Sequence, residues 1–164
     1  MARAHTCRVS FQRHLLIDGA NILHAWPQLR ALLKTDRDAA RSQLAQRAAA
    51  IHDVEQVRVT IVHDGRGEEL VIERPSQQPT FSVVYTPASL TADDVIEQMV
   101  ANAADAGACV VATEDQAERE TVAASGAATM RAEDLRAWIE RAEARQAAAM
   151  KALQQTNEQK WRRS

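Results

Sequence analysis

Residues 14–21 read HLLIDGAN: three apolar residues lead into Asp18, and the turn-forming residues Gly19 and Asn21 follow it. Two further apolar runs also end in an acid, VTIVHD at Asp64 and VVATED at Asp115. A fourth acid, Asp93 in SLTADDVIE, opens a predicted helix. In open parallel sheets, ligands bind at the carboxyl ends of the strands. We therefore expect acids from separate parts of the chain to converge at one edge of a sheet.

Carboxylates that meet repel one another unless a cation lies between them, and oxygen-only sites suit hard cations such as Mg²⁺ or Mn²⁺. The pattern predicts a metal-dependent enzyme that acts on phosphate esters, with Asp18, Asp93 and Asp115 as catalytic metal ligands. Each acid alone also fits a turn residue or a helix cap, so the prediction depends on their combination.

Apolar runs alternate with helical patterns along the chain, which predicts an α/β doubly wound sheet. Strands are expected at residues 14–17, 57–62, 81–85, 108–112 and 127–130, with a small hairpin near LVIE in the loop 65–79. Pro27 interrupts a short helical segment at 21–33. Longer helices are expected at 36–51, 92–106, 115–125 and 132–155, with Asp36 or Thr35 as the cap of the first, Thr91 as the cap of the second and Gly126 after the third.

The chain has 164 residues, of which 46% are hydrophobic and 26% charged, and this suits one globular domain. We expect a disordered lead-in at 1–12, the domain at 13–155 and a basic flexible tail at 156–164. No apolar run approaches the roughly 20 residues that span a bilayer, and the first residues do not form a secretory signal. Cys7 and Cys109 have no zinc-site spacing, so a reducing, cytoplasmic location is predicted.

Positive charge is concentrated near the C-terminus. Residues 131–164 carry eight Lys and Arg against five Asp and Glu, although the whole chain has a net charge of −2. An apolar stripe from Leu135 to Leu153 predicts packing on the sheet or on a second copy, so a monomer and a homodimer are both compatible. Beyond the stripe, the basic end KWRRS either contacts RNA or ribosomal phosphate or is a solubilising end without a partner.

Four segments together resemble one family: LLIDGANILHAWPQLRALL, IVHDGRG, TADDVIEQMV and VVATEDQAE. They are similar to the NYN ribonucleases, which are PIN-like nucleases, and within them to the YacP-like branch. The resemblance implies a three-layer fold with a mostly parallel sheet of order 3-2-1-4-5 flanked by helices. It also implies metal-dependent endoribonuclease cleavage that leaves a 5′-phosphate and a 3′-hydroxyl and, for some bacterial members, work on the ribosome.

The family's acidic positions match Asp18, Asp93 and Asp115. Asn21 matches the asparagine after the first acid, and Asp64 an acid after the second strand. The candidate supporting or substrate-contacting residues are Asn21, Asp64, Asp94, Glu97 and Thr113, and the candidate RNA contacts are Arg66, Lys160, Arg162 and Arg163. Glu114 departs from the family, which usually has serine there, and its charge is expected to affect metal affinity or substrate approach. The linker after Asp64 is also short for the family.

Other functions fit less well. An aspartyl-phosphate phosphatase needs a second acid two residues after its nucleophile, and Ala20 occupies that position after Asp18. A nucleotide-binding Rossmann domain needs a Gly-x-Gly-x-x-Gly turn after the first strand, which is missing. A non-catalytic RNA- or ribosome-binding module stays as the alternative. Trp26 is expected to anchor the core, with stacking on an RNA base as its alternative role.

Overall fold

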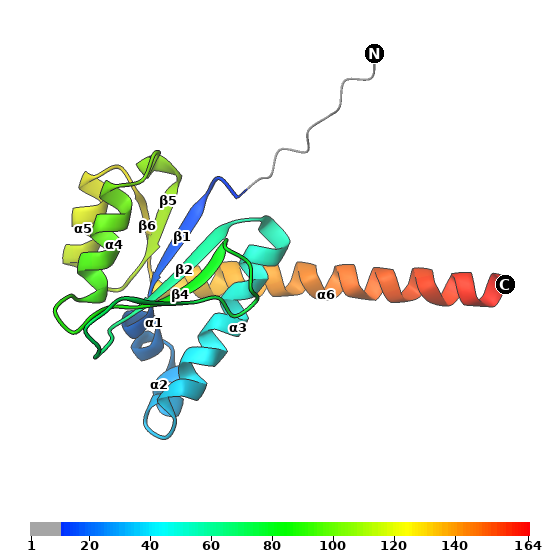
Figure 1. Cartoon of the computed structure of the whole chain (residues 1–164). Coiled ribbons are helices and arrows are strands. Elements are labelled where there is room, and N and C mark those ends of the chain that lie inside the picture. The colour runs from blue at the N-terminus through cyan, green and yellow to red at the C-terminus, as the bar shows by residue number, and fades with distance from the viewer. Residues whose placement is uncertain (1–10) are drawn as a thin grey trace, which may run out of the picture.

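The computed structural model describes residues 11–164, and a single six-stranded sheet forms the centre of the molecule (Figure 1). The sheet order is β3-β4-β2-β1-β5-β6, and every neighbouring pair is parallel except β3 with β4. The expected order of five parallel strands is confirmed, with β3 added as a sixth strand at the edge. The strands are β1 (His14–Asp18), β2 (Arg58–His63), β3 (Val71–Glu73), β4 (Phe81–Tyr85), β5 (Cys109–Ala112) and β6 (Ala128–Met130).

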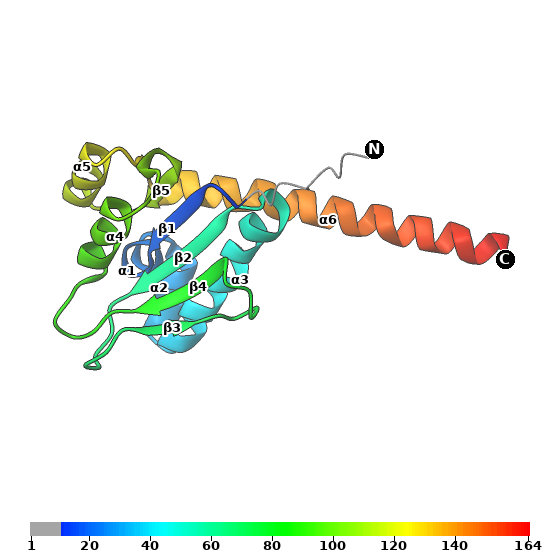
Figure 2. The same cartoon turned by 45° about the horizontal axis from the view of Figure 1, so that its top comes forward.

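Helices cover both faces of the sheet, which makes a three-layer structure (Figures 1 and 2). They are α1 (Gly19–Ala25), α2 (Pro27–Leu33), α3 (Arg37–Glu55), α4 (Ala92–Ala101), α5 (Gln116–Ala124) and α6 (Ala132–Arg163), with a short 3₁₀ helix η1 at Ala106–Ala108. Successive side chains of a strand point to opposite faces. Leu15 and Ile17 of β1 therefore belong to the core under α1, α2, α3 and α6, whereas Leu16 belongs to the core under α4 and α5.

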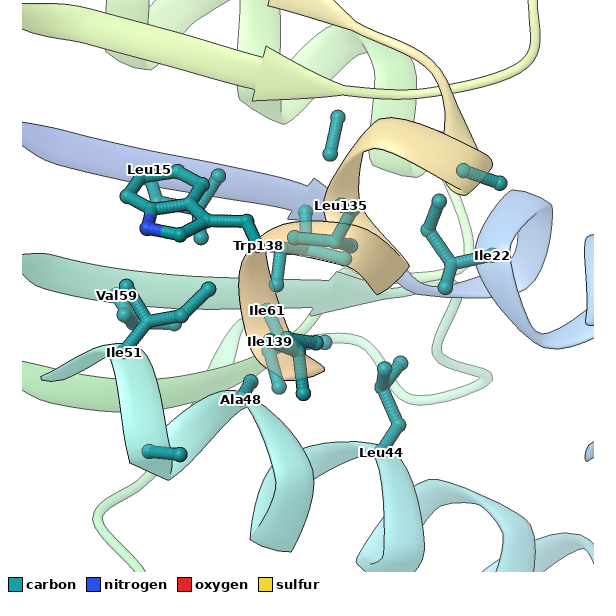
Figure 3. Packing of buried hydrophobic residues seen from close by; sticks show 14 of the residues in the cluster. Leu15, Ile22, Leu44, Ala48, Ile51, Val59, Ile61, Leu135, Trp138 and Ile139 are labelled. Atoms are coloured by element: carbon teal, nitrogen blue, oxygen red, sulfur yellow. The ribbon is translucent and has the colours of Figure 1, made fainter. Parts of the chain in front are cut away.

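The larger core joins three elements that are far apart in the sequence (Figure 3). Leu135, Trp138 and Ile139 of α6 pack with Ala48 and Ile51 of α3 and with Val59 and Ile61 of β2. The Trp138 indole Nε1 also donates to Glu55 Oε2 at 2.6 Å, at the end of α3. The part of the apolar stripe that lies in the first third of α6 thus packs on this face of the sheet and covers it.

The predicted caps are confirmed. Asp36 accepts from the Ala39 amide at 3.0 Å at the start of α3, and Thr91 and Asp94 form a reciprocal capping box on α4. Gly126 has a φ of +101° just past α5, where a residue with a side chain would be strained. Pro27 begins α2 and separates it from α1.

Helix ends differ most from the prediction. α6 continues to Arg163 and not to residue 155, so the predicted flexible tail is helical. The sequence from 132 to 163 contains neither glycine nor proline, so no residue stops the helix. α3 extends to Glu55, where Gln56 takes a left-handed conformation, and α4 ends at Ala101. The predicted lead-in and Cys7 lie mainly outside the described residues, and Cys109 is a buried free thiol.

The far half of α6 projects away from the sheet (Figures 1 and 2). Its large apolar side chains Met150, Leu153 and Trp161 are exposed, Trp161 to 84%. Within residues 11–164, no helix combines the length and the hydropathy that a membrane crossing requires.

Trp26 is an anchor of the larger core, as the sequence predicts. Its side chain is 2% exposed, and its indole Nε1 donates to the Ala132 carbonyl oxygen at 3.0 Å. The Arg47 guanidinium lies 5.4 Å from its ring centroid. Trp26 therefore holds the α1–α2 junction against the start of α6, and it is too buried to stack on a base.

We predict that Trp26→Ala lowers the free energy of unfolding by about 3–5 kcal/mol, because it leaves a cavity and removes the indole hydrogen bond to the Ala132 carbonyl oxygen. Chemical denaturation followed by circular dichroism measures this change. Trp161→Ala is the matched control and should leave the denaturation midpoint unchanged, since Trp161 is exposed. Equal midpoints for the wild type and Trp26→Ala would contradict the assigned role.

Candidate metal site at the carboxyl edge of the sheet

Asp18 is the last residue of β1 and caps α1, which starts at the next residue. It is 2% exposed, and it lies beside Val62 of β2 in the parallel register. Asn21 donates to its carboxylate twice, through the backbone amide at 3.4 Å and through Nδ2 at 3.0 Å. Asn21, predicted as a supporting or substrate-contacting residue, thus fixes the orientation of the Asp18 carboxylate.

Three carboxylates meet at this edge of the sheet, and we call them the carboxylate cluster: Asp18, Asp93 and Glu118. One oxygen of each lies within 4.8 Å of the others. Asp18 comes from β1, Asp93 from the first turn of α4 and Glu118 from the first turn of α5. The fold thus brings together two of the three predicted ligands and adds a third acid that the sequence analysis does not name.

Glu118, the site residue that the sequence did not predict, is only 2% exposed. Thr113, fully buried at the end of β5, donates from Oγ1 to Glu118 Oε2 at 2.7 Å, so the predicted supporting role of Thr113 has a definite target. Glu118 Oε1 is buried without a hydrogen-bond partner. The spacing Asp115-x-x-Glu118 could have predicted that Glu118 lies at the site. A residue three positions after an N-cap points back toward the start of the helix.

The pKa values of two members reflect this crowding. Burial, and then the neighbouring Asp18 carboxylate, raise the pKa of Asp93 to about 6. Burial and the same carboxylate raise the pKa of Glu118 to about 9, against the hydrogen bond from Thr113, which lowers it. Near neutral pH and without a cation, Glu118 therefore holds a proton.

Asp115 lies next to the carboxylate cluster as the N-cap of α5. Its Oδ1 accepts from the Ala117 amide at 2.9 Å and from the Glu118 amide at 3.2 Å, and its charge contributes to the raised pKa of Asp93. Asp115 thereby fixes the backbone that carries Glu118. Glu114, the departure from the family, points elsewhere: its Oε1 accepts from the Ala132 amide at 2.7 Å and caps α6.

The remaining predicted site residues lie around the cluster or away from it. Asp64 Oδ1 accepts from the Ala92 amide at 2.8 Å, which ties the loop after β2 to the start of α4 beside Asp93. Asp94 is exposed in the capping box, and Glu97 is half-buried one turn after Asp93 on α4. Arg66 is exposed in the loop after β2, whereas the free end of α6 carries the exposed Lys160, Arg162 and Arg163.

The donor set of the carboxylate cluster fits a hard divalent cation. All its ligand atoms are oxygens, which Mg²⁺ and Mn²⁺ prefer. No N–H or O–H group of the described residues donates to the buried Glu118 Oε1; without a cation, the proton that Glu118 holds offsets the repulsion from Asp18. A cation among the three carboxylates would satisfy this oxygen and lower the raised pKa values by opposite charge.

Comparison with known proteins gives a consistent result. Residues 15–164 match the family model of the YacP-like NYN domain. The uncharacterized protein YacP of Bacillus subtilis is 31% identical over 134 residues, which are 80% of this chain and 77% of that protein. A crystal structure of Rae1 (YacP) from Bacillus subtilis superposes with a TM-score of 0.70 at 28% identity, over 87% of this chain and 82% of that one. A point mutant of that protein gives a TM-score of 0.72 at the same identity, over 87% and 84%.

The raised pKa of Glu118 predicts a pH-dependent stability of the metal-free protein. A carboxyl group whose pKa is higher in the folded than in the unfolded state favours folding while it is protonated. This contribution is lost as the pH rises from about 4.5, the ordinary value, through about 9. With EDTA present, we expect Glu118→Gln to gain stability over the wild type as the pH rises, by up to about 1.4 kcal/mol per pH unit.

Melting temperatures of both proteins between the two pKa values measure this difference. Glu120→Gln is the matched control, because Glu120 lies on the same helix and is exposed; it should follow the wild type at every pH. Parallel curves for Glu118→Gln and the wild type would show that Glu118 is not a buried, protonated member of the cluster.

Proposed function

The chain belongs to the YacP-like NYN domain family of the PIN-like nucleases, and on this premise we propose that it is a metal-dependent endoribonuclease. Its reaction is hydrolysis of RNA phosphodiester bonds, with a 5′-phosphate and a 3′-hydroxyl as products, in the cytoplasm. The observation that carries the proposal is the carboxylate cluster, in which the buried carboxyl group of Glu118 meets those of Asp18 and Asp93.

Each residue of the site has a part in this reaction. Asp18, Asp93 and Glu118 hold Mg²⁺ or Mn²⁺, which when bound activates water and neutralises charge on the phosphate. Asn21 and Thr113 orient two of these carboxylates through their hydrogen bonds. Asp115 fixes the start of α5 and adds a fourth negative charge beside the cluster. Asp64 ties the loop after β2 to the start of α4 and so positions Asp93.

The free end of α6 supports a contact with RNA, in solution or on the ribosome. Lys160, Arg162 and Arg163 are exposed there around the exposed Trp161, so positive charge and an aromatic surface occur together. Such a combination binds single strands with little sequence preference. The same feature favours the alternative function, a non-catalytic RNA- or ribosome-binding module, and metal-stimulated cleavage of RNA separates the two.

We predict that Asp18→Asn abolishes cleavage and leaves the protein folded. The asparagine oxygen can still accept from the Asn21 amide and cap α1, but the charge that holds the cation is lost. Gel analysis of RNA incubated with Mg²⁺ or Mn²⁺ measures the activity, and circular dichroism the fold. Glu120→Gln, an exposed acid on α5 outside the cluster, is the control and should cleave like the wild type. Cleavage by Asp18→Asn at the wild-type rate would contradict the role of Asp18 as a metal ligand.

We also predict that a chain without residues 157–164 folds normally but binds RNA more weakly. All these residues are exposed, so their loss removes charge and no core contact. For three phosphate contacts, the dependence of log K on log salt should become shallower by about 0.7 for each contact. Fluorescence anisotropy over a salt series measures it, and Lys160, Arg162 and Arg163 changed together to Gln test charge alone. An unchanged salt slope would show that this end does not contact RNA.

A further inference from the structure

A cleft of about 580 Å³ lies beside the carboxylate cluster, between α1, α2, α3 and the loop after β2. We call it the basic cleft. Asp64 is its one acid, and that carboxylate is already hydrogen-bonded to the Ala92 amide. Five basic side chains line it: Arg30, Lys34, Arg37, Arg41 and Arg66. Across residues 11–164, none of these five takes part in an ion pair, although Asp38, Glu69 and Glu73 line the adjoining pocket beside Arg37, Arg41 and Arg66.

Two buried nitrogen atoms in the lining of the basic cleft have no hydrogen-bond partner, Arg41 Nε and His63 Nε2. The His63 side chain is 1% exposed. An unpaired buried donor costs free energy, which a bound acceptor would recover. Both groups are held in place by Tyr85, whose ring centroid lies 5.3 Å from the Arg41 guanidinium carbon and 5.6 Å from the His63 ring. The two nitrogens are thus preorganised for an anion.

The basic cleft and the carboxylate cluster adjoin through Gly19. This residue follows Asp18 of the cluster and precedes Ala20, which lines the cleft. A Cβ atom at Gly19 would lie 2.2 Å from His63 Nδ1, so only glycine lets the His63 ring lie against the backbone at this point. A polymer with repeated phosphates can therefore reach both sites at once.

We propose that the basic cleft binds a backbone phosphate of the RNA strand whose neighbouring phosphodiester lies at the carboxylate cluster. Arg41 Nε and His63 Nε2 donate to this phosphate, and Arg37 and Arg66 supply further positive charge at the mouth of the cleft. Leu23 and Leu33 form an apolar wall for the attached sugar or base. Burial, and then the Arg41 charge, lower the pKa of His63 to about 4, so its imidazole is neutral and donates in the tautomer that carries the proton on Nε2. The inference rests on the proposed function, because it names the substrate group that accompanies the scissile bond.

The test is binding of a labelled, short single-stranded RNA to the full chain in EDTA, where no cleavage occurs. Arg41→Gln should weaken binding about tenfold or more, since a charge-assisted hydrogen bond is lost, and should reduce the salt slope by about 0.7. Arg37→Gln, exposed on α3, is a second variant that cannot disturb the core and should weaken binding in the same direction. Arg58→Gln is the matched control, because Arg58 is exposed at the opposite end of β2.

Three outcomes overturn the proposal: wild-type affinity of folded Arg41→Gln and Arg37→Gln, an unchanged salt slope in both, or an equal loss in Arg58→Gln, which would indicate a general effect of charge. These outcomes are independent of catalysis. Suppose that the wild type cleaves RNA and Asp18→Asn does not, while Arg41→Gln and Arg37→Gln bind RNA normally. That result would support the nuclease function and contradict phosphate binding in the basic cleft. If no metal supports cleavage but Arg41→Gln and Arg37→Gln bind RNA more weakly, the result would support phosphate binding in the basic cleft and contradict the nuclease function.

Discussion

Repulsion among three carboxylates within 4.8 Å is the constraint to which the rest of this edge of the sheet is adapted. The fold offsets it in part with helix starts. Asp18 caps α1, Asp93 lies in the first turn of α4, and Glu118 lies in the first turn of α5 behind the cap Asp115. The N-terminal ends of helices carry partial positive charge, so each acid is placed where a helix stabilises it. The raised pKa values of Asp93 and Glu118, caused first by burial and then by Asp18, show that this compensation is incomplete, and either a proton or a bound cation would offset the remainder.

Acidic and basic side chains are concentrated in neighbouring parts of this edge of the sheet. The acids gather over β1, α4 and α5, whereas the arginines gather over α2, α3 and the loop after β2. Two glycines allow the close backbone contacts on which the arrangement depends: Gly19 under His63, and Gly65, where a Cβ atom would lie 2.0 Å from the Thr86 carbonyl oxygen. A cation can thus bind beside the acids while a polyanion binds beside the arginines, so that each ligand lies next to side chains of opposite charge.

The sequence predicts the parts of the site that depend on local chain geometry. Asp18 ends an apolar strand and Asp93 follows a threonine cap, so both positions follow from rules that act over a few residues. Glu118 depends on long-range packing. It is an acid on a short polar helix, a pattern typical of a solvent-facing residue, but α4 packs against α5 and Thr113 donates to it, so it is buried. The same holds for Arg41, which is one of several arginines near the start of α3 until Tyr85 of β4 places it in the cleft. The end of α6 shows the opposite case, since local helix propensity alone continues it past its last core contact.

The buried side-chain atoms that lack a partner give the strongest argument that these two sites act together. In the part of the chain that the structure describes there are three of them: Glu118 Oε1, Arg41 Nε and His63 Nε2. Unsatisfied buried polar atoms are rare in folded proteins, and each of them destabilises the fold. If these three atoms were defects of packing, they would be expected at unrelated positions in the molecule. Instead they lie at one edge of the sheet, an acceptor among carboxylates and two donors in the adjoining basic cleft. In the proposed function, a divalent cation would satisfy the first and a phosphate the other two. One ligand that carries both kinds of charge, a metal-bound nucleic-acid backbone, accounts for all three positions.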